Sequence, residues 1–151
     1  MAFEFFRDPL SPDGDLTLVL SECVEADASG FGVPMYTFEM RHTATRAYLG
    51  RIRLRVGWNE DVIKFAGQVG YLVEPSYRGN HFAERACRLI VPLARWHEME
   101  SLWITCQPDN VASRRTLERL GAQLVATLDV PEDYPLDAGA NRQKACYRWR
   151  V

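Results

Sequence analysis

Alternating apolar and polar residues run along much of the chain and predict β-strands. Leu16, Leu18 and Leu20 alternate with other residues, and the segment 48–56 alternates more strongly. Because successive side chains of a strand point to opposite faces, this period of two is typical of strands with one buried face. Together with apolar runs bounded by turn residues, the pattern predicts strands at 15–24, 35–41, 48–56, within 62–73, and at 101–106, 122–128 and 144–151.

The strand at 48–56 has a polar side made of arginine. Arg51, Arg53 and Arg55 alternate with the apolar residues Ile52 and Leu54. Side chains two residues apart share one face of a strand. We therefore expect the three arginines to lie together on one face of the sheet and to point into water.

The period changes to that of a helix after residue 79. One apolar stripe predicts an amphipathic helix over 79–97. The residues of the stripe are Phe82, Ala86, Leu89, Ile90 and Leu93. Pro92 lies inside this segment, where it removes a backbone hydrogen bond, so we expect a kink there.

A second helix is predicted at 110–120. Asn110 is a good N-cap, and Gly121 suits the position after the last turn. The elements then follow as four strands, a helix, a strand, a helix and two strands. The strand–helix–strand unit in the middle implies a right-handed parallel crossover, whereas the rest reads as antiparallel. We expect one α+β domain over 1–151, with a mixed, mostly antiparallel sheet.

Composition narrows the class of protein. The chain has 151 residues, of which 47% are hydrophobic and 25% charged, and its net charge is −2. This mixture is globular, and the slight acidity argues against electrostatic binding of nucleic acid. No apolar run approaches the roughly 20 residues that a membrane-spanning helix needs, and the start of the chain does not read as a signal peptide. We expect a cytoplasmic protein without nucleic-acid or membrane partners.

The cysteines and histidines do not suggest a metal site. The four cysteines are far apart in the sequence, at Cys23, Cys87, Cys106 and Cys146. They read as buried free thiols of a reducing compartment. The three histidines are equally scattered, so the spacing that metal ligation requires is missing.

The segment 70–83 carries the most specific chemistry. It reads Gly-Tyr-Leu-Val-Glu-Pro-Ser-Tyr-Arg-Gly-Asn-His-Phe-Ala, which predicts a strand that stops at Pro75, a tight polar turn, and the start of the first helix. The first N–H groups of a helix have no partner within it, and they favour an anion such as a pyrophosphate. This junction therefore predicts a ligand that bears phosphate.

Three segments of the chain resemble the GNAT superfamily of acyl-CoA-dependent N-acetyltransferases. They are Val73 to Ala83, Thr105 to Ser113, and Leu120 to Ala122, and the resemblance extends over about 67–122. The phosphate-binding signature of that family is Arg/Gln-x-x-Gly-x-Gly/Ala. Here it reads Arg78-Gly-Asn-His81-Phe-Ala83, with histidine where glycine is usual. A side chain at this position crowds the approach of a phosphate.

The resemblance implies acetyl-CoA as co-substrate and an amine as acceptor, either a small molecule or an exposed amino group of a peptide or protein. The acetyl group would pass directly to the amine. The strand before the turn would pair with the pantetheine arm, and the turn would hold the pyrophosphate. The residues implied for acetyl-CoA are Leu72, Val73, Arg78, Gly79, Asn80, His81, Phe82, Ala83, Asn110 and Ser113. The alternative is an inactive module of the same fold that only binds acyl-CoA.

The catalytic residues of the family are not all present. Leu117 stands where a tyrosine acid is common, and the fourth strand offers Gln68 and Tyr71 instead of a carboxylate. An acid must protonate the leaving sulfur, and a base must take the proton of the amine. The candidates are Tyr71 as acid and Glu39, Glu60 or Asp61 as base, with His81 as a proton relay. Each also has a plain structural reading, and catalysis through ordered water remains open.

The acceptor side is expected to be open. The family usually has one or two helices between its first two strands, but residues 25–34 are too few for two helices. A partner subunit of a homodimer would close the site, and the apolar final strand could be an edge that needs such cover. The acidic segment 129–137 either attracts a cationic amine or is a solvated loop. Three arginines of the second helix either meet phosphates or face water; these are Arg114, Arg115 and Arg119.

Overall fold

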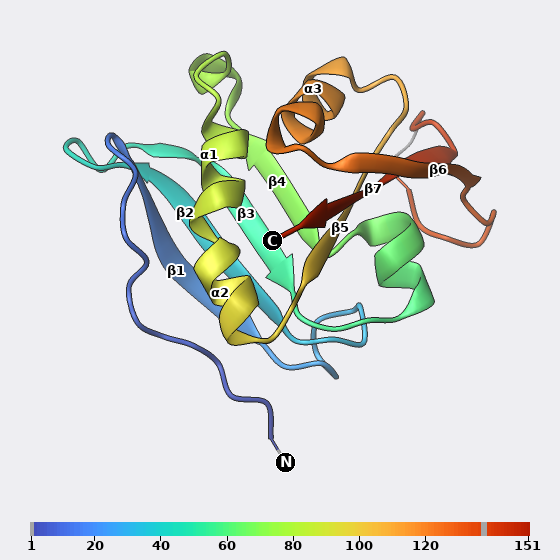
Figure 1. The fold of residues 1–151 in the computed structure, drawn as a ribbon, viewed down its shortest axis with the longest axis horizontal. Helices are drawn as coiled ribbons and strands as arrows, with labels where there is room; N and C mark the ends of the chain where they lie inside the picture. Colours follow the sequence, from blue (N-terminus) through green and yellow to red (C-terminus); the bar gives the residue numbers. More distant parts are fainter. Residues whose placement is uncertain (1, 137–138) are drawn as a thin grey trace.

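The computed structural model describes residues 2–136 and 139–151 (Figure 1). Its described strands form two sheets, and every strand pair is antiparallel. The first sheet has the order β1-β2-β3-β4, with bounds Leu16–Val24, Met35–His42, Tyr48–Arg55 and Val69–Val73. The second has the order β5-β7-β6, with bounds Ser101–Cys106, Gln143–Arg150 and Gln123–Asp129. The expected α+β class with a mostly antiparallel sheet is confirmed.

The two sheets meet where β4 and β5 begin to separate. The Gln68 N–H donates to the Trp103 carbonyl over 2.6 Å, and the Trp103 N–H donates to Gln68 Oε1 over 2.9 Å. Beyond this point the two strands form no ladder, and Figure 1 shows them diverging toward their C-terminal ends. The expected parallel pairing is thus limited to one end of the two strands. The outer edge of β4 is left without a strand partner among the described residues.

Two short helices cover one face of the first sheet (Figure 1). They are α1 (Phe82–Leu89) and α2 (Val91–Trp96), and the core lies between them and the strands. The helix expected over 79–97 begins later than predicted, because the residues before Phe82 form a turn. The interruption expected from Pro92 is confirmed: the helix is divided at Ile90, because Pro92 has no N–H to donate to the Arg88 carbonyl.

The helix α3 (Val111–Leu120) has the two ends that its sequence predicts. The Ser113 N–H donates to Asn110 Oδ1 over 3.1 Å, so the N-cap is confirmed. Gly121 has a φ of 84°, the left-handed conformation that glycine tolerates best at this position. Figure 1 places α3 next to the end of β4, and Arg119 Nε of α3 donates to Glu84 Oε1 of α1 over 2.8 Å.

The segment before β4 forms a turn of π-helix (η1, Val62–Ala66) instead of a longer strand. The Val62 N–H donates to Asn59 Oδ1 over 2.9 Å, and the backbone leaves the turn at Gly67, whose φ is 78°. These two features start and end the turn, so Val62, Ile63 and Phe65 are buried without extending β4. A single 3₁₀ turn (η2, Pro75–Tyr77) then follows β4.

Two other expectations about the sheets were wrong. Arg51 is exposed, but Arg55 is buried, because the loop before β2 brings the ring of Phe31 over its guanidinium. The final strand β7 is not an edge, because β5 and β6 pair with it on both sides. The edge strands of this sheet are β5 and β6, so the argument for a homodimer from β7 no longer holds, and the homodimer stays a prediction.

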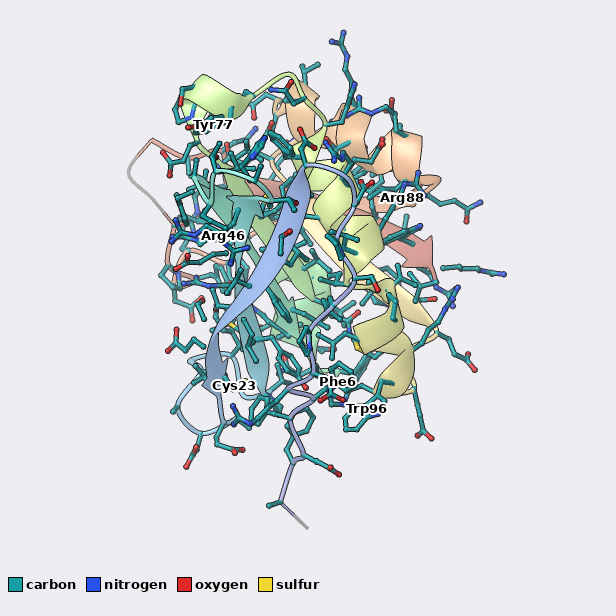
Figure 2. All side chains as sticks on the ribbon, turned by 90° about the vertical axis from the view of Figure 1, so that its left-hand side faces the viewer. Phe6, Cys23, Arg46, Tyr77, Arg88 and Trp96 are labelled. Atoms are coloured by element: carbon teal, nitrogen blue, oxygen red, sulfur yellow. The ribbon has the colours of Figure 1, made fainter. Side chains whose placement is uncertain are left out.

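The start of the chain packs along the helices without forming a helix or strand of its own (Figure 2). Figure 2 shows Phe6 beside Trp96, and their ring centroids lie 5.3 Å apart. The Phe6 N–H donates to the hydroxyl of Tyr36 over 2.7 Å. Residues 25–34 form turns only, as expected for so short a segment. In the described part of the chain, none of the helices has the length and apolar character needed to span a membrane.

Candidate functional site

A cavity of about 430 Å³ lies between the end of β4, the turn after it, and α3. We call it the turn cavity. Of the residues expected to bind acetyl-CoA, all but Asn80 line it, namely Leu72, Val73, Arg78, Gly79, His81, Phe82, Ala83, Asn110 and Ser113. Arg115 and Arg119 of α3 line it too, whereas Arg114 instead donates to the hydroxyl of Tyr147 over 3.0 Å. The cavity thus combines an unpaired strand edge, a helix N-terminus and cationic side chains.

The turn 78–81 leaves the start of α1 available to an anion. No side chain among the described residues caps this helix, so the first N–H groups have no partner from a cap. Arg78 is exposed, and its Nε donates to the Val73 carbonyl over 3.2 Å. The side chain of Asn80 points back into the turn, where its Nδ2 donates to the Tyr77 carbonyl over 3.1 Å. Asn80 therefore shapes the turn, and its contact with a ligand stays a prediction.

His81 adopts the conformation that the usual glycine of this signature would take without strain. Its φ is 58° and its ψ is 26°, in the left-handed region. A side chain in this region costs roughly 1 kcal/mol. The turn therefore keeps the left-handed backbone that a glycine would adopt easily at this position, at some cost in stability.

We expect His81→Gly to raise the free energy of unfolding by about 0.5–1 kcal/mol and to tighten acetyl-CoA binding, since it relieves the strain and uncrowds the turn. Urea unfolding and calorimetric titration measure the two effects. His42→Gly is the control, because His42 has an ordinary strand conformation and this change should destabilise the protein. A loss of affinity in His81→Gly would instead show that the imidazole itself contacts the ligand.

Tyr71 and Ser113 form the inner wall of the turn cavity. Their hydroxyl groups share a hydrogen bond of 2.7 Å, and burial raises the pKa of Tyr71. The same two residues, together with Asn110, also line a second cavity of about 840 Å³, which we call the central cavity. A hydroxyl pair at the wall that two cavities share can act on atoms that meet there from both sides. The Tyr71–Ser113 contact joins β4 to α3, and the sequence alone does not indicate it.

The central cavity lies on the side where an acceptor was expected. Aromatic rings of Phe31, Phe65 and Tyr134 line it, with the cationic side chains of Arg55 and Lys144. It adjoins a third cavity of about 970 Å³, because Phe31, Tyr134 and Pro135 line both. Glu60, Asp61 and Asp133 line that third cavity. The acidic segment 129–136 therefore forms a wall of the open side, while Asp137 lies outside the described residues.

The three carboxylates expected as bases, Glu39, Glu60 and Asp61, share none of the three cavities with Tyr71. Glu39 is on β2, where Arg41 Nε donates to its Oε2 over 2.8 Å, and it lines none of the three cavities. Glu60 lines the third cavity and lies 3.7 Å from Lys64 Nζ. No carboxylate or histidine is among the described residues that line the central cavity. A base role for Glu39 or Glu60 has no support from this geometry and stays a prediction.

Two residues that the resemblance aligns with common catalytic positions, Leu117 and Gln68, have structural roles here. Leu117 is fully buried in the core. Gln68 is also buried. Its Nε2 donates to the Gly57 carbonyl over 2.8 Å, and its Oε1 accepts from the Trp103 N–H of β5 over 2.9 Å. Within the described ranges, no group of three or more His, Cys, Asp or Glu side chains is placed to hold a metal ion.

Comparisons with solved structures point to one fold. RimJ of Mycobacterium smegmatis, in complex with CoA-disulfide, is 18% identical with a TM-score of 0.62, over 82% of this chain and 56% of that one. MccE, a microcin C7 self-immunity acetyltransferase in complex with acetyl-CoA and AMP, is 16% identical with a TM-score of 0.59, over 78% and 61%. The ribosomal-protein-S5-alanine acetyltransferase of Vibrio fischeri is 16% identical with a TM-score of 0.62, over 77% and 61%.

The chain spans less than two thirds of the length of each of these three proteins. A search of curated proteins gave no match. The family model described as "Acetyltransferase (GNAT) domain" matches residues 3–123, which is most of the chain. The resemblance to this family is thereby confirmed, and the chain belongs to the GNAT family of acetyltransferases.

Proposed function

We propose that this protein is an acetyl-CoA-dependent N-acetyltransferase that passes the acetyl group directly to an amine. The observation that carries the proposal is the position of the Tyr71–Ser113 pair, which forms part of the wall of both the turn cavity and the central cavity. A thioester that enters from one cavity and an amine that enters from the other would meet at this pair. Direct transfer requires such a meeting point.

The turn cavity suits the two ends of acetyl-CoA. The free edge of β4 at Leu72 and Val73 offers backbone groups that can pair with the amides of pantetheine, as an added strand would. The uncapped start of α1, with Arg78 beside it, suits the pyrophosphate. MccE bound to acetyl-CoA and RimJ bound to CoA-disulfide have the same fold, which supports this choice of co-substrate.

The chemistry needs a neutral amine and a proton for the leaving sulfur. The amine nitrogen attacks the thioester carbonyl, the C–N bond forms, the C–S bond breaks, and the nitrogen loses a proton to solvent. Tyr71 would donate its proton to the thiolate and recover one through Ser113. Because aromatic rings and Lys144 line the central cavity, desolvation and like charge both favour the neutral amine there. This route does not require a carboxylate base.

An acyl-CoA-binding module without transferase activity is the second candidate. The buried Leu117 and the strained His81 favour it, since each replaces a residue that the family commonly uses. Turnover of acetyl-CoA with an amine distinguishes the two candidates. The four cysteines are free in the structure, which agrees with a reducing compartment, and we place the protein in the cytoplasm.

Calorimetric titration with acetyl-CoA tests the cofactor site. We expect micromolar binding to the unaltered protein and about tenfold weaker binding to Arg78→Ala, which loses one charged contact with the pyrophosphate. The control is Arg95→Ala, because Arg95 is an exposed arginine of α2 that lines none of the three cavities. The absence of binding at millimolar acetyl-CoA, or equal affinities in the two variants, would overturn this assignment.

A further inference from the structure

Arg55 is a buried cation without a partner carboxylate among the described residues. Its side chain lies at the end of β3, and the residue is only 7% exposed. Its two hydrogen bonds both come from Nη1, which donates to the carbonyls of Gly67 and Ala66 over 2.9 and 3.4 Å. The Nε–H is buried and has no partner among the described residues. One edge of the guanidinium is therefore unsatisfied.

The guanidinium is held next to a cavity wide enough for a ligand. The ring of Phe31 covers one of its faces, with Arg55 Cζ 4.0 Å from the ring centroid. A Cβ atom at Gly70 would lie 3.6 and 3.7 Å from Nη1 and Nη2, so the side chain lies against the backbone of β4. Both Arg55 and Gly70 line the central cavity. The stacked ring and the adjoining strand hold the guanidinium in one position at the cavity wall.

A purely structural role does not require this charge. Burial lowers the pKa of Arg55 to about 10, and the guanidinium is still cationic at neutral pH. Two backbone carbonyls satisfy one nitrogen only, and a buried cation is costly unless an anion or further hydrogen bonds compensate for it. An anion that enters the central cavity would supply both the negative charge and further hydrogen bonds.

We propose that Arg55 binds a carboxylate of the acceptor, so that the substrate of this enzyme is a zwitterionic amine with its carboxylate a few bonds from the nitrogen. This inference rests on the proposed transferase function. Arg55, Tyr71 and Ser113 all line the central cavity, so one small molecule bound there can contact both the guanidinium and the Tyr71–Ser113 pair. The planar guanidinium can bind a carboxylate through charge-assisted hydrogen bonds.

The first experiment measures the anion site without turnover. 3-Phenylpropanoate and its neutral amide are titrated against ¹⁵N-labelled protein, and the Arg55 Nε–H resonance is followed by NMR. The acid should shift this resonance and bind at least tenfold more tightly than the amide. Arg55→Met should lose the preference, and Arg53→Met should keep it, because Arg53 lies on the same strand face but does not line the central cavity. Equal binding of acid and amide, or a preference that survives Arg55→Met, would overturn the proposal.

The second experiment measures specificity in turnover. Acetyl-CoA consumption is followed with paired acceptors, each offered as the free amino acid and as its amide, for example L-phenylalanine and L-phenylalaninamide. We expect kcat/KM to favour the acid, and Arg55→Lys and Arg55→Met to lower the acid-to-amide ratio at least tenfold. The acid-to-amide ratio of kcat/KM within one variant does not depend on the fraction of that variant that is folded. If the unaltered enzyme prefers amides to acids, this inference alone is overturned. If no amine is turned over although the NMR resonance shifts, the transferase proposal is overturned instead.

Discussion

Replacing Tyr71 with phenylalanine is expected to lower kcat by roughly a hundredfold or more, with acetyl-CoA affinity unchanged, since a positioned acid contributes about 10²–10⁴ to such reactions. Tyr71 lies at the wall that both cavities share and is the acid proposed for the leaving thiolate. Burial raises the pKa of Tyr71, so its hydroxyl is protonated at neutral pH before the thiolate forms. Phenylalanine keeps the ring and removes only the proton donor.

The matched control is Tyr147→Phe. Tyr147 is also buried, and its hydroxyl accepts a hydrogen bond from Arg114 Nε over 3.0 Å, but it lines none of the three cavities. Each variant loses one hydrogen bond, so each should lose about 1 kcal/mol of stability. Only Tyr71→Phe should lose activity, measured as thiol release from acetyl-CoA with an amine that the unaltered protein accepts. Equal kcat values in the two variants would exclude Tyr71 as the acid.

Ser113→Ala separates two parts of the same mechanism. If Ser113 returns the proton to Tyr71, this variant should lose less activity than Tyr71→Phe, because solvent can replace the serine hydroxyl. Ser113 also donates its backbone N–H to Asn110, and alanine keeps that bond, so the start of α3 should be unaffected. A Ser113→Ala loss as large as that of Tyr71→Phe would indicate that the pair acts as a unit.

The parts of the site that are local in sequence could be predicted from the sequence. The turn after β4 and the cap of α3 each depend on residues within a few positions of one another, such as Asn110 and Ser113. The unusual His81 could also be identified, although its left-handed backbone is visible only in the structure. The strand pattern predicted the antiparallel sheet for the same reason, since alternation is a local property.

The parts that depend on distant contacts could not be predicted. The Tyr71–Ser113 bond joins residues 42 positions apart, and no local pattern indicates it. Arg55 follows the same alternation as Arg51, and only the loop residue Phe31 and the cavity beside it make Arg55 a buried cation. The edge position of β6 depends on how β7 enters the second sheet, which strand order along the chain does not determine.

Gly50→Ala is expected to lower the free energy of unfolding by about 3 kcal/mol or more, because overpacking against backbone atoms cannot be relieved by a rotamer change. A Cβ atom at this position would lie 2.1 Å from the Leu72 carbonyl oxygen and 2.9 Å from Val73 Cα. Gly50 pairs with Val73 in the β3–β4 ladder, and Leu72 and Val73 form the edge proposed for pantetheine. The substitution must therefore push β4 away from β3 and displace the strand edge that lines the turn cavity.

Gly121→Ala is the control that separates this clash from backbone strain. Gly121 also has a positive φ, of 84°, but a Cβ atom there would meet nothing within 4 Å, so its cost should be about 1 kcal/mol. Urea unfolding compares the stability of the two variants. Titration with acetyl-CoA at low temperature, where both variants are folded, compares their affinities. Gly50→Ala should lose both stability and affinity, and Gly121→Ala should lose a little stability only. Equal stability losses would mean that β4 can shift away from β3 freely, and that its edge is not held in place by the close approach at Gly50.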